Sequence, residues 1–124
     1  MLKKENRANR KTIEQIFQKG AFINSASLAF KFIFDQKLKA PVISFITPKT
    51  ISKSAVKRNA LRRRGYYALE NYFNDLPNNI AGVFVFSKKS LEYFAGKKNK
   101  KYNPISNLEH EIKNILSKIP LEAF

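Results

Sequence analysis

Two apolar segments on either side of one long helical pattern occupy residues 42–87 of the chain. Residues 42–47 and 80–87 are rich enough in β-branched and aromatic side chains to form strands. Between them, residues 54–74 have a helical period and bring together on one face Leu61, Gly65, Ala68, Leu69 and Tyr72. A strand, a helix and a second strand in this order predict a βαβ unit with two parallel strands.

Shorter patterns flank this unit on both sides. Residues 11–19 have a helical period, with Thr12 as the expected N-cap and a glycine directly after them. Residues 27–35 alternate with period two and predict a strand, which residues 21–24 could accompany as a short neighbour. Residues 106–119 carry one apolar stripe and predict a terminal helix.

These elements predict an α+β fold, a two-layer sandwich in which helices pack on a mixed central sheet. The apolar density of residues 42–47 is typical of a central strand that is buried on both faces. The length of 124 residues fits a single domain over residues 1–124. Residues 1–10 are basic and polar, and we expect them to form a mobile arm.

The charge of the chain indicates what it binds. Lys and Arg number 24 against 9 Asp and Glu, which gives a net charge of +15. Such an excess goes well beyond what solubility requires, and its field attracts polyanions. A nucleic acid is the first candidate partner, and an anionic membrane surface or an acidic protein is the alternative.

Positive charge gathers in one acid-free stretch, residues 36–69. It contains Lys37, Lys39, Lys49, Lys53, Lys57, Arg58, Arg62, Arg63 and Arg64. Five of these cations fall in the first half of the predicted long helix, where no acid four residues away relieves their repulsion. The helix dipole makes positive charge unfavourable there as well. An external anion, such as RNA phosphate, would compensate both costs.

The chemistry of an autonomous enzyme is missing from the sequence. The single histidine, His110, stands between Glu109 and Glu111, where a solvated helix face is the better interpretation. The other carboxylates are scattered, and cysteine is absent. We therefore expect no catalytic residues, no metal site, no cofactor bound by the protein and no small-molecule substrate. Without an apolar run of the ~18 residues that span a bilayer, we also expect no membrane partner and a cytoplasmic location.

The sequence is rich in aromatic side chains, with 11 Phe and 5 Tyr. Exposed rings could stack on unpaired bases of single-stranded RNA, whereas buried rings would build the core. Both interpretations stay open for Phe17, Phe22, Phe30 and Phe32.

Residues 55–63, Ala-Val-Lys-Arg-Asn-Ala-Leu-Arg-Arg, resemble the signature helix of the protein subunit of bacterial ribonuclease P. The pattern of that family runs Ala-Val-x-Arg-Asn-Arg-x-Lys-Arg. Residues 13–20 are similar to its first helix, which ends in Phe-x-x-Gly. Two departures stand out, because Ala60 replaces the second signature arginine and Tyr66 replaces an arginine expected three residues after Arg63.

The resemblance implies an accessory subunit of an endoribonuclease. Such a subunit binds the ribonuclease P RNA and the 5′ leader of precursor tRNA during tRNA 5′ maturation. The RNA and the Mg2+ that it requires perform the hydrolysis, and the protein alone is inactive. The resemblance also implies a left-handed crossover in the βαβ unit. A ribosomal or assembly-type RNA-binding protein without a catalytic role is the alternative.

The resemblance also assigns residues to two sites. Those expected to contact the catalytic RNA are Lys49, Lys53, Lys57, Arg58, Asn59, Arg62, Arg63 and Arg64. Asn59 would supply an amide hydrogen bond or a local brace. Those expected near the leader, in a cleft between the first helix and the sheet, are Ile13, Phe17, Phe30 and Phe32.

Overall fold

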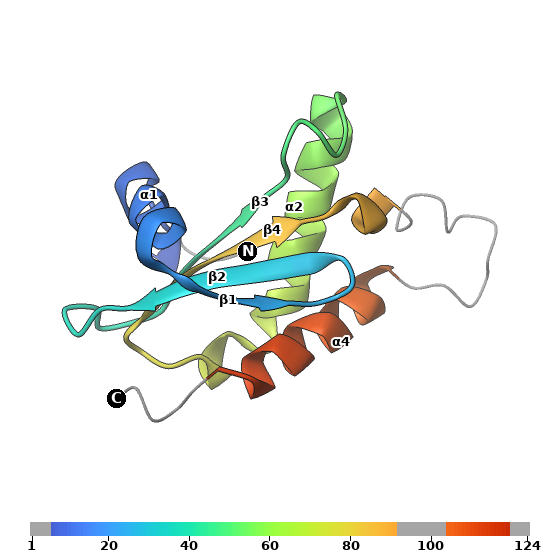
Figure 1. Ribbon diagram of the computed structural model, residues 1–124. Coiled ribbons are helices and arrows are strands. Elements are labelled where there is room, and N and C mark those ends of the chain that lie inside the picture. Colours follow the sequence, from blue (N-terminus) through green and yellow to red (C-terminus); the bar gives the residue numbers. More distant parts are fainter. Residues whose placement is uncertain (1–5, 92–103, 120–124) are drawn as a thin grey trace.

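A mixed four-stranded sheet divides the helices of the protein into two groups (Figure 1). The computed structural model describes residues 6–91 and 104–119. The elements are α1 (Arg10–Lys19), β1 (Ala21–Asn24), β2 (Leu28–Phe34), β3 (Val42–Ile46), α2 (Ala55–Glu70), η2 (Phe73–Asp75), β4 (Ile80–Phe86), η3 (Lys88–Leu91) and α4 (Pro104–Ser117). The strand order is β1-β2-β4-β3, with β3 parallel to β4 and the other pairs antiparallel. The predicted α+β class and the parallel strand pair are confirmed.

The main core lies between the sheet and the helices α2 and α4. Because side chains alternate along a strand, the even-numbered positions of β2 and β4 all face this side. The Phe84 ring stacks on Phe30 and on Phe45, with centroid distances of 4.4 and 4.8 Å. The apolar stripe predicted for the terminal helix is confirmed, because Leu108, Ile112, Ile115 and Ile119 are buried in this core.

Helix α2 approaches the sheet closely at Gly65. A Cβ atom added there would lie 2.6 Å from Phe45 Cε2 and closer still to Phe45 Cδ2. Glycine costs roughly 1 kcal/mol relative to alanine inside a helix. Packing offsets this cost, because only glycine lets the helix backbone contact the Phe45 ring.

Helix α1 covers the opposite face of the sheet. Its Ile16 is fully buried against Ala81 and Val83 of β4. The helix begins one residue earlier than predicted, and Asn9 is the N-cap instead of Thr12. The Asn9 Oδ1 accepts a hydrogen bond of 2.8 Å from the Thr12 backbone N–H.

Strand β3 is an edge strand, so the prediction that residues 42–47 form a central strand is wrong. Its outer edge is nevertheless covered. The Phe45 backbone N–H donates to the Tyr66 hydroxyl at 3.2 Å. The Ser44 hydroxyl accepts from the Ala8 N–H at 3.0 Å and donates to the Ala8 carbonyl at 3.1 Å. The strand is rich in apolar residues because α2 and the N-terminal segment protect it.

The same contacts change the expectation of a mobile arm over residues 1–10. Ala8 is hydrogen-bonded to β3, and the Asn6 side-chain amide donates to the Pro41 carbonyl at 3.3 Å. Arg10 already belongs to α1. Residues 6–10 are therefore packed on the domain, and residues 1–5 lie outside the described part.

Two predicted boundaries move. The long helix ends at Glu70 with Asn71 as its C-cap, and the short helix η2 follows where the prediction continued the helix to residue 74. The terminal helix begins at Pro104, whose fixed backbone angle suits a first helical position. In the described ranges, no helix is long and apolar enough to span a lipid bilayer.

Helix α4 is tied to the turn between β1 and β2 through Glu111. Its Oε1 accepts hydrogen bonds of 2.7 Å from the Ser25 hydroxyl and from the Ser27 backbone N–H. Its Oε2 accepts from the Ser27 hydroxyl. Three donors on one carboxylate fix the end of the hairpin to the helix.

Candidate nucleic-acid interface

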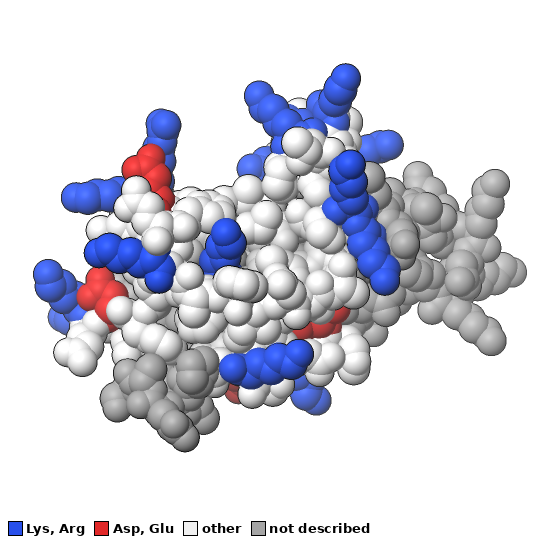
Figure 2. Space-filling view, viewed as in Figure 1, with Lys and Arg blue, Asp and Glu red and all other residues white. Residues whose placement is uncertain are grey.

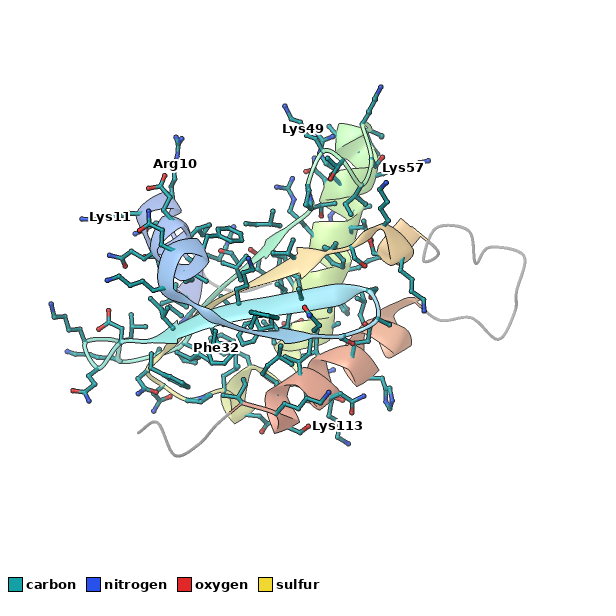
Figure 3. The ribbon with its side chains drawn as sticks, viewed as in Figure 1. Arg10, Lys11, Phe32, Lys49, Lys57 and Lys113 are labelled. Carbon is teal, nitrogen blue, oxygen red and sulfur yellow. The ribbon has the colours of Figure 1, made fainter. Side chains whose placement is uncertain are left out.

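Exposed cations surround the start of α2 (Figure 2). Lys49, Lys53 and Lys57 are exposed. Lys49 and Lys57 lie at the same end of α2, whereas Lys113 on α4 lies at the opposite side of the view (Figure 3). Ser54 caps this end, since its hydroxyl accepts a hydrogen bond of 3.2 Å from the Lys57 N–H. We call Lys49, Lys53, Lys57, Arg62 and Arg63 the α2 basic surface.

Arg58 and Asn59, the two central residues of the signature, have different surroundings. Arg58 is half-buried, and its Nη1 donates to the Ser52 carbonyl at 2.8 Å. Arg58 therefore braces the loop that leads into α2, in addition to carrying charge. Asn59 is exposed, and its Oδ1 accepts a hydrogen bond from Nη2 of Arg62. This contact joins Asn59 to Arg62, while the role expected for Asn59 in RNA binding stays a prediction.

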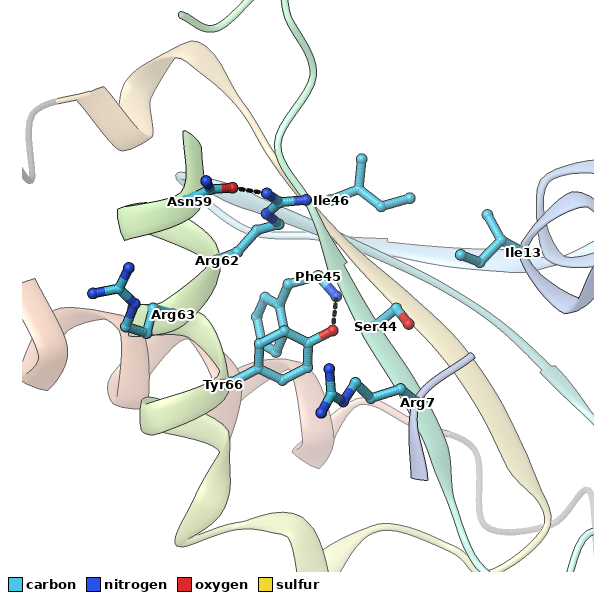
Figure 4. Close-up of a pocket in the computed structure, with 9 residues that line it drawn as sticks. All are labelled: Arg7, Ile13, Ser44, Phe45, Ile46, Asn59, Arg62, Arg63 and Tyr66. Carbon is cyan, nitrogen blue, oxygen red and sulfur yellow. Dashed lines mark hydrogen bonds between the residues drawn. The ribbon is translucent and has the colours of Figure 1, made fainter. Parts of the chain in front are cut away.

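A basic hollow of about 460 Å³ lies beside the outer edge of β3 (Figure 4). It is lined by Arg7, Ile13, Ser44, Phe45, Ile46, Asn59, Arg62, Arg63 and Tyr66. Its cations come from two places, because Arg62 and Arg63 belong to α2 and Arg7 to the N-terminal segment. No carboxylate is among these lining residues. Guanidinium groups above an apolar floor suit an anionic partner that also carries flat apolar groups, as a nucleotide does.

Tyr66, which replaces an expected arginine, has a structural position in this hollow. It is buried, its ring meets Phe45 edge-on at 4.9 Å, and its hydroxyl accepts from the backbone of β3. The cation that the family pattern expects is therefore absent from this position. Arg7 reaches the same hollow from the N-terminal segment (Figure 4). Sequence reasoning missed Arg7, because it stands among the basic residues of the expected mobile arm.

A second candidate surface lies on the face of the sheet that α1 covers in part. Phe17 of α1 is 44% exposed, and the Lys31 ammonium lies 4.9 Å from the centre of its ring. Phe22 is 64% exposed and stands opposite Lys31 in the β1–β2 register. We call Phe17, Phe22 and Lys31 the aromatic patch. Exposed rings next to a cation can stack on bases while the cation attracts phosphate.

The cleft candidates Phe30 and Phe32 lie elsewhere. Both are buried in the main core on the opposite face of the sheet, so their expected position in a cleft beside α1 is wrong. The alternation of β2 turns Lys31 toward α1 and the two phenylalanines toward α2 and α4. Ile13 does lie on the α1 side, where it lines the basic hollow.

Within residues 6–91 and 104–119, no group of three or more His, Cys, Asp or Glu could hold a metal ion. His110 is exposed on α4. What the described surface offers is positive charge and exposed rings.

Comparisons with known proteins agree with this description. The family model of ribonuclease P matches residues 1–119. A Thermotoga maritima RNase P protein has 17% identity and a TM-score of 0.76, covering 92% of this chain and 97% of that one. The same protein in complex with 1-(4-fluorophenyl)-2-thiourea has 17% identity and a TM-score of 0.73, over 90% and 96% of the two chains. A Staphylococcus aureus RNase P protein mutant with defective mRNA degradation activity has 11% identity and a TM-score of 0.72, over 92% and 87%. At these identities the structures show a shared fold. No curated protein sequence matches the chain.

Proposed function

This chain belongs to the ribonuclease P protein family and is a protein subunit of ribonuclease P, and we propose from this premise how its surfaces are used. The α2 basic surface and the basic hollow bind the catalytic RNA. The aromatic patch binds the 5′ leader of precursor tRNA. The RNA, with its own Mg2+, cleaves the leader in the cytoplasm, and the protein contributes binding without catalytic residues.

The observation that carries the proposal is the concentration of positive charge at the start of α2. Lys53, Lys57, Arg62 and Arg63 are exposed, and no acid occurs in residues 36–69. The ion pair between Arg10 and Glu14 belongs to α1, so it does not compensate these cations of α2. Positive groups near a helix N-terminus repel each other and the helix dipole. RNA phosphates would relieve that repulsion, so the placement of these charges favours RNA binding.

The division between two surfaces follows from their chemistry. Guanidinium groups in the basic hollow match the phosphates of a folded RNA, which are fixed in place. The aromatic patch instead offers two exposed rings on a sheet face, which suits the unpaired bases of a single-stranded leader. The alternative of a ribosomal or assembly-type protein is not favoured, because the family match extends over residues 1–119.

The proposal is tested by measuring the affinity of the chain for a bacterial ribonuclease P RNA across a range of salt concentrations. Replacing both Arg62 and Arg63 by alanine should weaken binding and reduce the salt slope by roughly 0.7–0.9 log units for each phosphate that the variant no longer neutralises. Lys113→Ala is the matched control, because it removes an exposed charge from α4 on another side of the domain. An unchanged slope in the double variant would refute the assignment of RNA binding to α2.

A further inference from the structure

The side of α2 that faces away from the sheet carries an unexpected line of apolar side chains. Val56 is 77% exposed and Tyr67 is 61% exposed. With 100° per residue, Val56, Ala60 and Tyr67 fall within about 40° of each other on the helix. The core residues Leu61 and Gly65 point the other way. This line is therefore not needed for the core, and it runs through the most basic helix of the protein.

A shallow second hollow lies on this outer side. Its volume is about 270 Å³, and it is lined by Ala60, Arg63, Arg64 and Tyr67. The side chain of Ala60 is small and leaves this space open, and Tyr67 contributes to its lining. Among the described residues, Tyr67 has no hydrogen bond or ring contact with another side chain. The ring is thus available to a partner.

Charge and shape together select that partner. An anion is favoured, because the exposed Arg63 lines the hollow and residues 36–69 contain no acid. A flat apolar group also fits, because the exposed Tyr67 ring offers an apolar face on which it can stack. A nucleotide has both properties, since its base stacks on an aromatic ring while its phosphate meets a guanidinium group.

We propose that the hollow at Ala60 and Tyr67 holds one unpaired base of the ribonuclease P RNA, stacked on the Tyr67 ring with Arg63 beside it. The inference rests on the proposed function, because it names a contact within the same protein–RNA interface. It also explains the departure at Ala60. An arginine at this position would fill the hollow and bind a phosphate, whereas alanine leaves room for a stacked base.

The test compares Tyr67→Ala with Tyr67→Phe in equilibrium binding to the catalytic RNA. Removing the ring under one stacked base should weaken binding by about 5-fold to 150-fold. The Tyr67→Phe variant keeps the ring and should bind like the unmodified chain. Since the ring carries no charge, the salt slope should stay unchanged in both variants. Because Tyr67 is exposed, the thermal midpoint of unfolding should also stay unchanged, which controls for folding.

A second variant tests the role of Ala60. In the Ala60→Arg background the hollow is filled, so Tyr67→Ala should have little further effect, and the salt slope should rise by roughly 0.7–0.9 log units. If Tyr67→Ala binds the RNA as tightly as the unmodified chain while the Arg62 and Arg63 double variant loses affinity, the stacked base is refuted and the proposed function stands. If the outer side of α2 instead binds a protein, Tyr67→Ala should likewise leave the affinity for the RNA unchanged, and the stacked base is refuted. If the unmodified chain does not bind the RNA, both proposals fail.

Discussion

Gly65→Ala should destabilise this protein, although the same change stabilises most helices. At an exposed position inside a helix, alanine is favoured over glycine by roughly 1 kcal/mol. At Gly65 the new Cβ would lie 2.6 Å from Phe45 Cε2, where an ordinary contact is at least 3.4 Å. One of the two groups must move.

Neither group has room to move. Phe45 is 3% exposed, stacks on Phe84 at 4.8 Å and meets Tyr66 edge-on at 4.9 Å. Overpacking a well-filled core costs about 1–3 kcal/mol, and the overlap here places the cost in the upper part of that range. After the propensity gain of about 1 kcal/mol is subtracted, the free energy of unfolding should fall by about 1–2 kcal/mol.

Urea denaturation followed by circular dichroism measures this change as a lower midpoint with an unchanged slope. The matched experiment is a double-mutant cycle with Phe45→Leu, which removes the ring that the new methyl group would strike. In that background Gly65→Ala should cost less or become stabilising, with a coupling energy above about 0.5 kcal/mol. A stabilisation of about 1 kcal/mol in the unmodified background would refute the close approach of α2 to β3.

Three further contacts that hold the two surfaces in place are tested by substitution, each with the same urea assay. Tyr66→Phe leaves the Phe45 N–H without its acceptor and should cost about 1–3 kcal/mol; an unchanged stability would mean that water replaces the hydroxyl. Asn9→Ala removes the cap of α1 and should cost about 0.5–2 kcal/mol, whereas a change within error would contradict the capping role. Glu111→Ala strips three donors of their acceptor and should cost more than Ser27→Ala, which removes one; equal costs would show that the carboxylate is not the centre of this contact.

The types of the main elements could be predicted from the sequence because each carries a clear hydrophobic period. Residues 42–87 alternate between strand, helix and strand patterns, and the parallel pair follows from that order. A glycine on the apolar face of the long helix indicates a close approach to the sheet, and the structure confirms it at Gly65. The hydrophobic period does not fix the helix ends, since caps such as Asn9 depend on one side-chain hydrogen bond.

The position of a strand in the sheet could not be predicted from its hydrophobic pattern. β3 has the composition of a central strand, yet it lies at the edge. Its outer edge is protected by Tyr66, which is 21 residues away, and by Ala8, which is 36 residues away. A local pattern reports that a strand is covered, but the segments that cover it are fixed only by tertiary packing.

The residues of the candidate sites also differ in how far the sequence alone predicts them. The basic residues of α2 could be found from composition, because their charge is independent of the fold. The residues of the cleft depend on which face of β2 meets α1, and the path of the chain determines that face. Lys31 was the available signal, since a lysine seldom faces a core and its neighbours Phe30 and Phe32 must then face one. Arg7 offered no such signal, because its place beside β3 arises from the contacts of Ala8.

The most direct test of the central claim is a cleavage assay with precursor tRNA and a bacterial ribonuclease P RNA at low Mg2+. We expect the chain to stimulate removal of the 5′ leader by the RNA and to cleave nothing when the RNA is left out. The Arg62 and Arg63 double variant should stimulate less at the same protein concentration, and Lys113→Ala should stimulate fully. Failure of the unmodified chain to stimulate cleavage, or cleavage by the chain alone, would contradict an accessory subunit that acts by binding RNA.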